Sequence, residues 1–235
     1  MPKIDSLQKK HALPHLGGIV DYLNICDGSV IAVVGCGGKT SLIGLLANKL
    51  REKKVLVSTT TKMFPIQGIQ CQGLLNKASG KLEALPAEAL ASLIPQYDIT
   101  LLEADGSRGL PCKGWLPNEP LVPHYCTHTV GIVTISALGK AATETIAHRL
   151  REFLSLTGLK EGETITAQAL EAMTCAPGGM FESSAGKQYL LVNQVEDEAA
   201  AKAAQSFLKN IKQNHLNRFE RLLYGSVLRD TWNEV

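Results

Sequence analysis

The segment Gly-Cys-Gly-Gly-Lys-Thr at positions 35–40 combines residue types suited to holding a polyphosphate. Glycines let backbone N–H groups approach phosphate oxygens closely, and the start of a following helix favours an anion. A lysine here bridges β- and γ-phosphates, and a hydroxyl ligates Mg²⁺. The simpler alternative is a glycine-rich turn that only permits close packing of helix on strand. The predicted nucleotide-binding residues are Gly35, Gly37, Gly38, Lys39, Thr40 and Ser41.

The loop is two residues shorter than the standard phosphate-binding signature, because only Cys36 and Gly37 separate Gly35 from Gly38. This G-x-x-G-K-T spacing resembles the loop of the Mur-type amide ligases as much as that of ordinary P-loop NTPases. A shorter loop encloses less of the β-phosphate.

Two carboxylates follow a hydrophobic run at residues 99–102. Glu103 and Asp105 are two residues apart, so in an extended segment they point to the same side. Beside a phosphate loop, one acid would hold magnesium and the other would orient or deprotonate a nucleophile. Glu103, with Thr40, is the first candidate for magnesium, and Asp105 is a catalytic candidate. The alternative is a solvated turn, because Asp-Gly and Gly-Ser are ordinary loop formers.

Three further cationic residues, Lys62, Arg108 and Lys113, follow near the predicted site. Lys62 follows three threonines at the end of a short apolar run, where it would neutralise charge on a transferring phosphoryl group. Arg108 and Lys113 flank a proline-rich stretch and are suited to gripping an anionic substrate. A solvated surface pair is the alternative for these two. The predicted catalytic residues are Lys39, Asp105, Lys62 and Arg108.

Apolar and polar runs alternate along the chain in a way that indicates regular elements. Strands are expected at residues 29–34, 55–57, 98–104, 130–135, 189–192 and 221–227. Helices are expected at residues 16–23, 41–51, 86–94, 145–156, 166–174 and 197–212, with a loop or small hairpin at 68–80 and an extended loop at 111–123. Repeated alternation of strand and helix predicts an α/β fold with a mostly parallel, doubly wound sheet of the P-loop NTPase type. Ligands then bind at the carboxyl ends of the strands.

Length and composition narrow the class of protein. The chain has 235 residues, 45% of them hydrophobic, and a net charge of +2. We expect a single domain over residues 1–235, with a loosely held leader at 1–15 and a possible helical insertion at 140–185. A small net charge without a basic stripe argues against nucleic-acid binding. No apolar run approaches the ~20 residues that span a bilayer, and the N-terminus lacks an apolar secretory core. These features predict a cytoplasmic protein without a membrane partner.

Three segments together resemble one family. They read Val-Val-Gly-Cys-Gly-Gly-Lys-Thr-Ser-Leu, Ser-Thr-Thr-Thr-Lys-Met-Phe and Leu-Leu-Glu-Ala-Asp-Gly-Ser-Arg-Gly-Leu-Pro-Cys-Lys, at positions 33–42, 58–64 and 101–113. They look like the YqeC-type accessory proteins of selenium-dependent molybdenum hydroxylases, and the likeness runs from about residue 29 to 197. The resemblance implies a nucleotide-binding factor in the biosynthesis or insertion of the selenium-dependent cofactor. The implied partners are the nucleotide and the hydroxylase or its cofactor.

The implied cofactors are Mg²⁺ and ATP or GTP. The family often has an Asn-Lys-x-Asp-like run where this chain reads Asn193-Gln194-Val195-Glu196, so guanine recognition is weakened and ATP is favoured. Asn193 remains a nucleotide-binding candidate, and a simple turn before an N-cap at Asp197 is the alternative. The reaction has three alternatives: NTP hydrolysis or phosphoryl transfer, ATP-dependent ligation through an acyl phosphate, and non-catalytic delivery of a cofactor.

Two weaker patterns involve cysteine and histidine. His124, Cys126 and His128 alternate, so an extended backbone would present three possible metal ligands on one side. Surface histidines with a buried cysteine are the alternative. Cys36 lies beside a helix start and Lys39, which would lower its thiol pKa, and Cys112 is a second candidate thiol.

Overall fold

The computed structural model describes residues 18–235. The predicted leader at 1–15 and the first two residues of the helix predicted at 16–23 lie outside this range.

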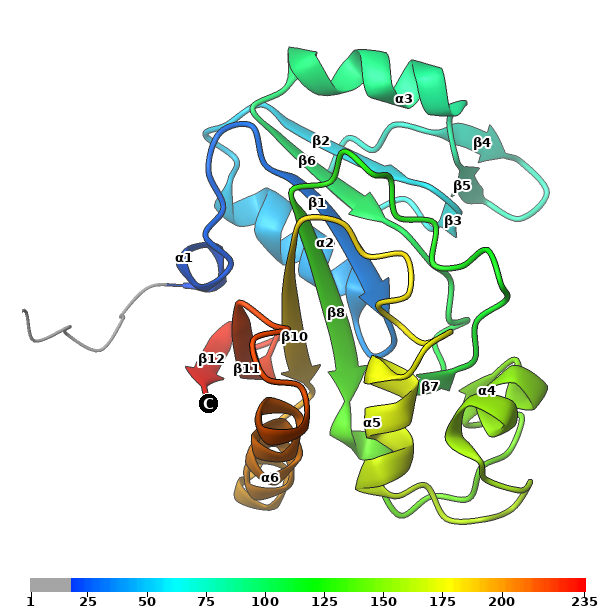
Figure 1. Ribbon diagram of the computed structural model, residues 1–235. Coiled ribbons are helices and arrows are strands. Elements are labelled where there is room, and N and C mark those ends of the chain that lie inside the picture. Colours follow the sequence, from blue (N-terminus) through cyan, green and yellow to red (C-terminus); the bar gives the residue numbers. More distant parts are fainter. Residues whose placement is uncertain (1–17) are drawn as a thin grey trace, which may run out of the picture.

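A seven-stranded sheet forms the centre of the molecule, in the order β12-β11-β10-β8-β1-β6-β2 (Figure 1). Every neighbouring pair is parallel except β11 and β12, which are antiparallel. The strands are β1 Val30–Gly35, β2 Val55–Thr59, β6 Ile99–Glu103, β8 His128–Thr134, β10 Lys187–Asn193, β11 Arg221–Ser226 and β12 Thr231–Glu234. The six predicted strands and the mostly parallel α/β fold are confirmed; β12 was not predicted.

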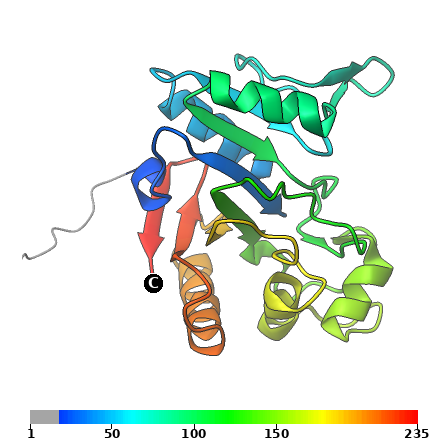
Figure 2. The same cartoon turned by 45° about the horizontal axis from the view of Figure 1, so that its top comes forward.

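Helices cover both faces of this sheet (Figures 1 and 2). The apolar side chains of α1 and α2 pack on one face, and those of α3, α4, α5 and α6 pack on the other. The helices are α1 Ile19–Tyr22, α2 Lys39–Lys49, α3 Ala87–Leu93, α4 Leu150–Thr157, α5 Ala167–Cys175 and α6 Glu198–Asn214, with 3₁₀ turns at Ile94–Gln96 and Ile135–Ala137.

Strand β1 shows how the sequence supports this layering. All six of its residues are buried. Successive side chains of a strand point to opposite faces, so Ile31 and Val33 pack with α2 whereas Ala32 and Val34 pack in the cluster that contains α5 and α6. A continuous run of β-branched residues is what a strand covered on both faces requires.

Several local predictions are corrected. The helix predicted at 145–156 begins only at Leu150, because Ala147–His148 form strand β9, which pairs with β7 (Cys112–Lys113). The proline-rich segment expected to be an extended loop therefore contains a short strand. By contrast, the small hairpin expected as one of two alternatives at 68–80 is confirmed and extends to residue 83. Strand β4 (Leu74–Asn76) pairs antiparallel with β5 (Lys81–Glu83), and β3 (Lys62–Met63) completes this small sheet.

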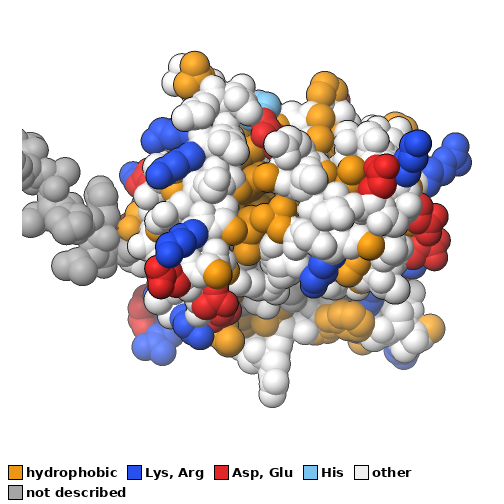
Figure 3. Space-filling model, turned by 90° about the horizontal axis from the view of Figure 1, so that it is seen from below, with side chains coloured by type: hydrophobic (Ala, Val, Ile, Leu, Met, Phe, Trp, Pro, Cys, Tyr) orange, Lys and Arg blue, Asp and Glu red, His pale blue; other side chains and the backbone are white. Residues whose placement is uncertain are grey.

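The helical segment predicted as a possible insertion packs on the main core. Phe153 of α4 and Leu170 of α5 belong to the same hydrophobic cluster as Ala32 of β1 and Leu190 of β10. The single-domain organisation itself stays a prediction. Within residues 18–235, no helix combines the length and apolar character needed to cross a membrane. Seen from below the view of Figure 1, charged side chains of both signs lie mostly toward the two sides of this face, and hydrophobic side chains lie near its centre (Figure 3).

Candidate functional site

The glycine-rich loop lies where the topology of the sheet changes direction. Strand β1 pairs with β6 on one side and β8 on the other, and the loop runs from its carboxyl end into α2. In open α/β sheets, ligands bind outside the carboxyl ends of the strands at such a switch point. The predicted loop is therefore at the position in this fold where a bound ligand is expected.

The loop glycines adopt conformations that other residues rarely adopt. Gly37 has φ +99° and Gly38 has φ +125°. A Cβ on Gly38 would lie 2.6 Å from the Asn193 side-chain nitrogen, and one on Gly37 would lie 2.9 Å from Thr134 Cβ. Both positions therefore need glycine for backbone shape and for space.

The backbone N–H groups of residues 37–41 have no hydrogen-bond acceptor within the described part of the chain. By contrast, Gly35 N donates to Asp105 Oδ2 at 3.0 Å and Cys36 N donates to the Ile132 carbonyl at 2.7 Å. Gly38 occupies the N-cap position of α2 without a side-chain cap. Free amides at a helix start, together with the helix dipole, form an anion-binding cradle.

Lys39 and Asp105 form a buried ion pair under the loop. Lys39 Nζ lies 3.1 Å from Asp105 Oδ1 and donates to the Gly35 carbonyl at 2.6 Å. Burial is the largest single influence and works against the Lys39 charge, but Asp105, Cys36 and Glu103 together outweigh it, so the pKa of Lys39 lies above its ordinary value. Burial likewise opposes the Asp105 charge, yet Lys39 and Lys113 hold the pKa of Asp105 below its ordinary value. Both groups are therefore charged at neutral pH.

Glu103 and Thr40 lie together at the end of β6. Thr40 Oγ1 donates to Glu103 Oε2 at 2.7 Å. Burial is the main cause that raises the pKa of Glu103 above its ordinary value, and Lys39 and Thr40 act in the opposite direction. Magnesium in nucleotide sites is held by one or two carboxylates or hydroxyls, with phosphate oxygens and water completing the shell. The donor set of Thr40 and Glu103 fits this chemistry.

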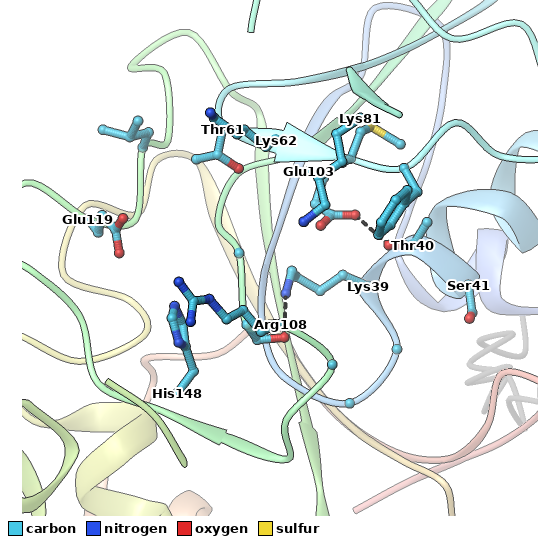
Figure 4. Close-up of a pocket in the computed structure, with 18 of the residues that line it drawn as sticks. Lys39, Thr40, Ser41, Thr61, Lys62, Lys81, Glu103, Arg108, Glu119 and His148 are labelled. Atoms are coloured by element: carbon cyan, nitrogen blue, oxygen red, sulfur yellow. Dashed lines mark hydrogen bonds between the residues drawn. The ribbon is translucent and has the colours of Figure 1, made fainter. Parts of the chain in front are cut away.

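A cavity of about 890 Å³ opens above the loop (Figure 4). Its cationic residues outnumber its acids, and Lys39 lies between the Thr40–Glu103 pair and a wall that carries Arg108 and His148 (Figure 4). The charged lining residues are Lys39, Lys62, Lys81, Glu103, Arg108, Glu119 and Arg149. The predicted residues Gly37, Gly38, Thr40 and Ser41 also line it.

The structure does not bring all predicted residues into this cavity. Asp105 is fully buried beneath it and also accepts from Trp115 Nε1 at 2.9 Å. Lys113 is fully buried as well, with Nζ 3.5 Å from Asp105 Oδ2 and 3.2 Å from Glu119 Oε2. The predicted grip of Arg108 and Lys113 on an anionic substrate is therefore wrong for Lys113, and the alternative of a solvated surface pair is wrong for the same reason. Lys62 lines the cavity, and its Nζ lies 2.8 Å from Glu83.

Arg149 and His148 are cavity residues that the sequence did not assign. Arg149 forms a bidentate pair with Glu119, with Nη2 to Oε1 at 2.8 Å. The adjacent His-Arg pair is visible in the sequence, but its partner lies thirty positions away and nothing local identifies it.

Asn193 supports the loop from below. Its Nδ2 donates to the Gly37 carbonyl at 2.7 Å, and its Oδ1 accepts from Val227 N at 2.8 Å. It also lines a second cavity of about 440 Å³, which shares Gly38, Ser41 and Gln194 with the larger one. The turn that follows leads into α6, whose N-cap Asp197 accepts from Ala200 N as the alternative interpretation expected.

The structure does not support the roles considered for the cysteines and histidines. Burial raises the pKa of Cys36 to about 12 despite the neighbouring Lys39, so the prediction of a lowered thiol pKa is wrong. The pKa of Cys112 is also raised by burial. His128 begins β8 and stacks on Tyr189, Cys126 is buried, and His124 is exposed. Within residues 18–235, no group of three His, Cys, Asp or Glu residues is placed to hold a metal ion.

The sheet order and the loop define an α/β fold of the P-loop NTPase type, and the comparisons with known proteins identify the family. The family model described as YqeC protein matches residues 31–78 and 68–151. A protein of Escherichia coli (strain K12) named YqeC is 34% identical over 182 residues, which cover 66% of this chain and 71% of that protein. The chain belongs to the YqeC family. No solved structure matches it.

Proposed function

We propose that the protein binds a magnesium–purine nucleotide at the glycine-rich loop and acts on its terminal phosphate. The observation that carries this proposal is the combination of free amides at residues 37–41 with the Thr40–Glu103 pair on one cavity. The amides suit phosphate oxygens, and the hydroxyl and carboxylate suit magnesium. Lys39 lies within the loop and supplies the positive charge that bridges β- and γ-phosphates.

The two cavities meet at Gly38, Ser41 and Gln194. A nucleotide with its phosphates in the larger cavity would extend past Ser41 and place its base in the smaller one, against Leu45 and Leu228. This placement uses the continuous space at the carboxyl ends of β1 and β10.

ATP is favoured over GTP by the contacts of the two residues that would read guanine. The Asn193 amide is bonded on both its nitrogen and its oxygen within the protein. Glu196 Oε1 accepts from Ser226 Oγ at 2.6 Å, and its Oε2 lies 2.7 Å from Arg229 Nε. Each side chain therefore already uses part of its hydrogen-bonding capacity within the protein, which leaves less of it for a guanine edge.

Lys62 is proposed to neutralise charge that develops on the transferred phosphoryl group. It is exposed on β3 and lines the cavity beside Thr61. Asp105 is proposed to act through Lys39, which it holds charged and oriented, rather than by direct contact with a nucleophile. The family resemblance supports a role in the maturation of a selenium-dependent molybdenum hydroxylase, with that enzyme or its cofactor as partner.

Glu103→Gln tests the magnesium site. Glutamine keeps an oxygen for the Thr40 hydroxyl but removes the charge, so we expect the gain in nucleotide affinity on adding Mg²⁺ to fall by about 10–100-fold. Calorimetric titration with ATP and GTP, each with Mg²⁺ and with a chelator, measures this gain. Glu88→Gln, an exposed change on α3, is the matched control. An unchanged magnesium effect in Glu103→Gln would contradict the assignment.

Assays of the wild-type protein distinguish the three reaction alternatives. Phosphate release from ATP alone indicates hydrolysis, and release that needs a carboxylate substrate with an amine or selenium nucleophile indicates ligation. Tight retention of nucleotide without release, even with the partner present, indicates delivery.

A further inference from the structure

Backbone strain is concentrated at the large cavity. Non-glycine residues rarely have positive φ, although Asn and Asp tolerate it, and such strain clusters at functional sites. Within residues 18–235, three residues other than Gly, Asn or Asp have positive φ, and all three line this cavity. They are Arg108 at +53°, Arg149 at +57° and Gln194 at +63°.

Arg108 and His148 lie on the wall opposite the magnesium side of the cavity, and Arg149, the residue after His148, also lines this cavity. Figure 4 shows Arg108 beside His148, across Lys39 from the Thr40–Glu103 pair. Arg108 is exposed and makes no ion pair or side-chain hydrogen bond within the described part of the chain. Arg108 is therefore a cation without a counter-ion among the residues described. Its backbone is left-handed, and it lines the cavity.

Arg149 is oriented by Glu119. A guanidinium has five N–H donors, and the bidentate pair with Glu119 uses two of them, so the remaining donors are left for another acceptor. His148 directly precedes Arg149 in the sequence, and Figure 4 shows it beside Arg108. Burial lowers the pKa of His148, and Arg149 and Arg108 lower it further, so the imidazole is neutral at neutral pH.

We propose that Arg108, His148 and Arg149 form a second anion subsite, which binds the phosphate or carboxylate group of a second substrate opposite the nucleotide phosphates. The inference rests on the proposed function, because it assigns the nucleotide to the loop amides, Lys39 and the Thr40–Glu103 pair. Two arginines with free donors suit an oxyanion, which they bind through paired hydrogen bonds. The neutral imidazole adds one donor without repelling the arginines.

The test measures oxyanion binding while the nucleotide site is filled. The protein is saturated with Mg²⁺ and the non-hydrolysable ATP analogue AMPPNP, so the γ-phosphate position is occupied. Inorganic phosphate is then titrated and followed by phosphorus NMR line width, and succinate is titrated as a competitor to distinguish carboxylate from phosphate. Arg108→Gln is the main variant because the side chain has no protein partner to lose. Arg149→Lys is the second, because it keeps the charge but loses the bidentate geometry.

We expect the dissociation constant for phosphate to rise about tenfold or more in Arg108→Gln, with AMPPNP affinity within about twofold of wild type. Arg151→Gln, an exposed change on α4 outside the cavity lining, is the control and should leave both unchanged. Suppose that AMPPNP binds, but that phosphate and succinate either do not bind or bind equally to wild type and Arg108→Gln. This result would overturn the anion subsite and leave the nucleotide site intact. No AMPPNP binding together with Arg108-dependent phosphate binding would refute the nucleotide function and support the subsite.

Discussion

Asp105→Asn is expected to lower the free energy of unfolding by about 3–5 kcal/mol. The carboxylate is fully buried between Lys39 and Lys113, and it accepts hydrogen bonds from Gly35 N and Trp115 Nε1. Asparagine keeps the size of the side chain but removes the charge, so two buried ammonium groups lose their shared counter-ion. Breaking one partner of a buried ion pair is costly because an uncompensated charge stays inside.

Urea unfolding followed by circular dichroism measures this loss. Asp98→Asn is the control, because Asp98 is exposed and its side chain accepts only from Lys54 N among the residues described. Adding Lys113→Met to Asp105→Asn should recover part of the stability, since it removes a buried ammonium group left with Glu119 as its one counter-ion among the residues described, while Glu119 keeps its pair with Arg149. A loss below about 1 kcal/mol in the single variant would contradict the buried-charge interpretation.

The difference in the free energy of unfolding between wild type and Asp105→Asn is expected to depend on pH in a defined direction. The pKa of Asp105 is lower in the folded protein than in the unfolded chain, so its contribution to stability is complete above the unfolded value. That contribution is lost as the pH falls through about 4 towards the folded pKa. The stability curves of wild type and Asp105→Asn should therefore converge in acid and be parallel from about pH 5 to 8. Convergence at alkaline rather than acid pH would contradict the assignment.

Lys39→Met is expected to weaken Mg–ATP binding by about 10–150-fold, the value of a charge-assisted hydrogen bond to phosphate. Methionine preserves much of the aliphatic packing of this buried side chain. The fold is expected to persist, because Asp105 keeps its contacts with Lys113, Gly35 N and Trp115. Phosphate release should fall further than affinity, because the lysine also stabilises charge on the transferred group.

Calorimetry with Mg–ATP and a phosphate-release assay check this result. Lys49→Met is the matched control: it removes a lysine from the other end of the same helix, where it pairs with Asp230 near the surface. Surface pairs of this kind contribute about 0–1 kcal/mol, so its nucleotide affinity should equal that of wild type. A folded Lys39→Met protein that binds and hydrolyses ATP normally would exclude the loop as the phosphate site.

The sequence predicted the elements that carry their information locally. The β-branched run of β1, the glycine loop and the amphipathic start of α2 are contiguous, so position and spacing were enough to place Lys39 and Thr40. Glu103 at the end of β6 was found because parallel strands bring their carboxyl ends to one edge.

The remaining site residues depend on contacts between distant parts of the chain. The side-by-side placement of Glu103 and Asp105 assumed an extended segment, but β6 ends at Glu103 and Asp105 turns beneath the loop to meet Gly35 N. Arg149 could be recognised as a site residue only from the structure, which shows its pair with Glu119 and the start of α4 at Leu150. Asn193 was a nucleotide-binding candidate, and its hydrogen bonds to the Gly37 carbonyl and from Val227 N could not be read from the sequence.

The most direct test of the central claim is the response of the backbone amides at residues 37–41 to Mg–ATP, measured by nitrogen–proton correlation NMR, with adenosine as the control ligand. If these amides hold the phosphates, their resonances shift with Mg–ATP and saturate together, and adenosine leaves them unchanged. If the resonances of the amides at residues 37–41 do not shift at millimolar Mg–ATP, the claim that this loop binds a nucleotide is contradicted.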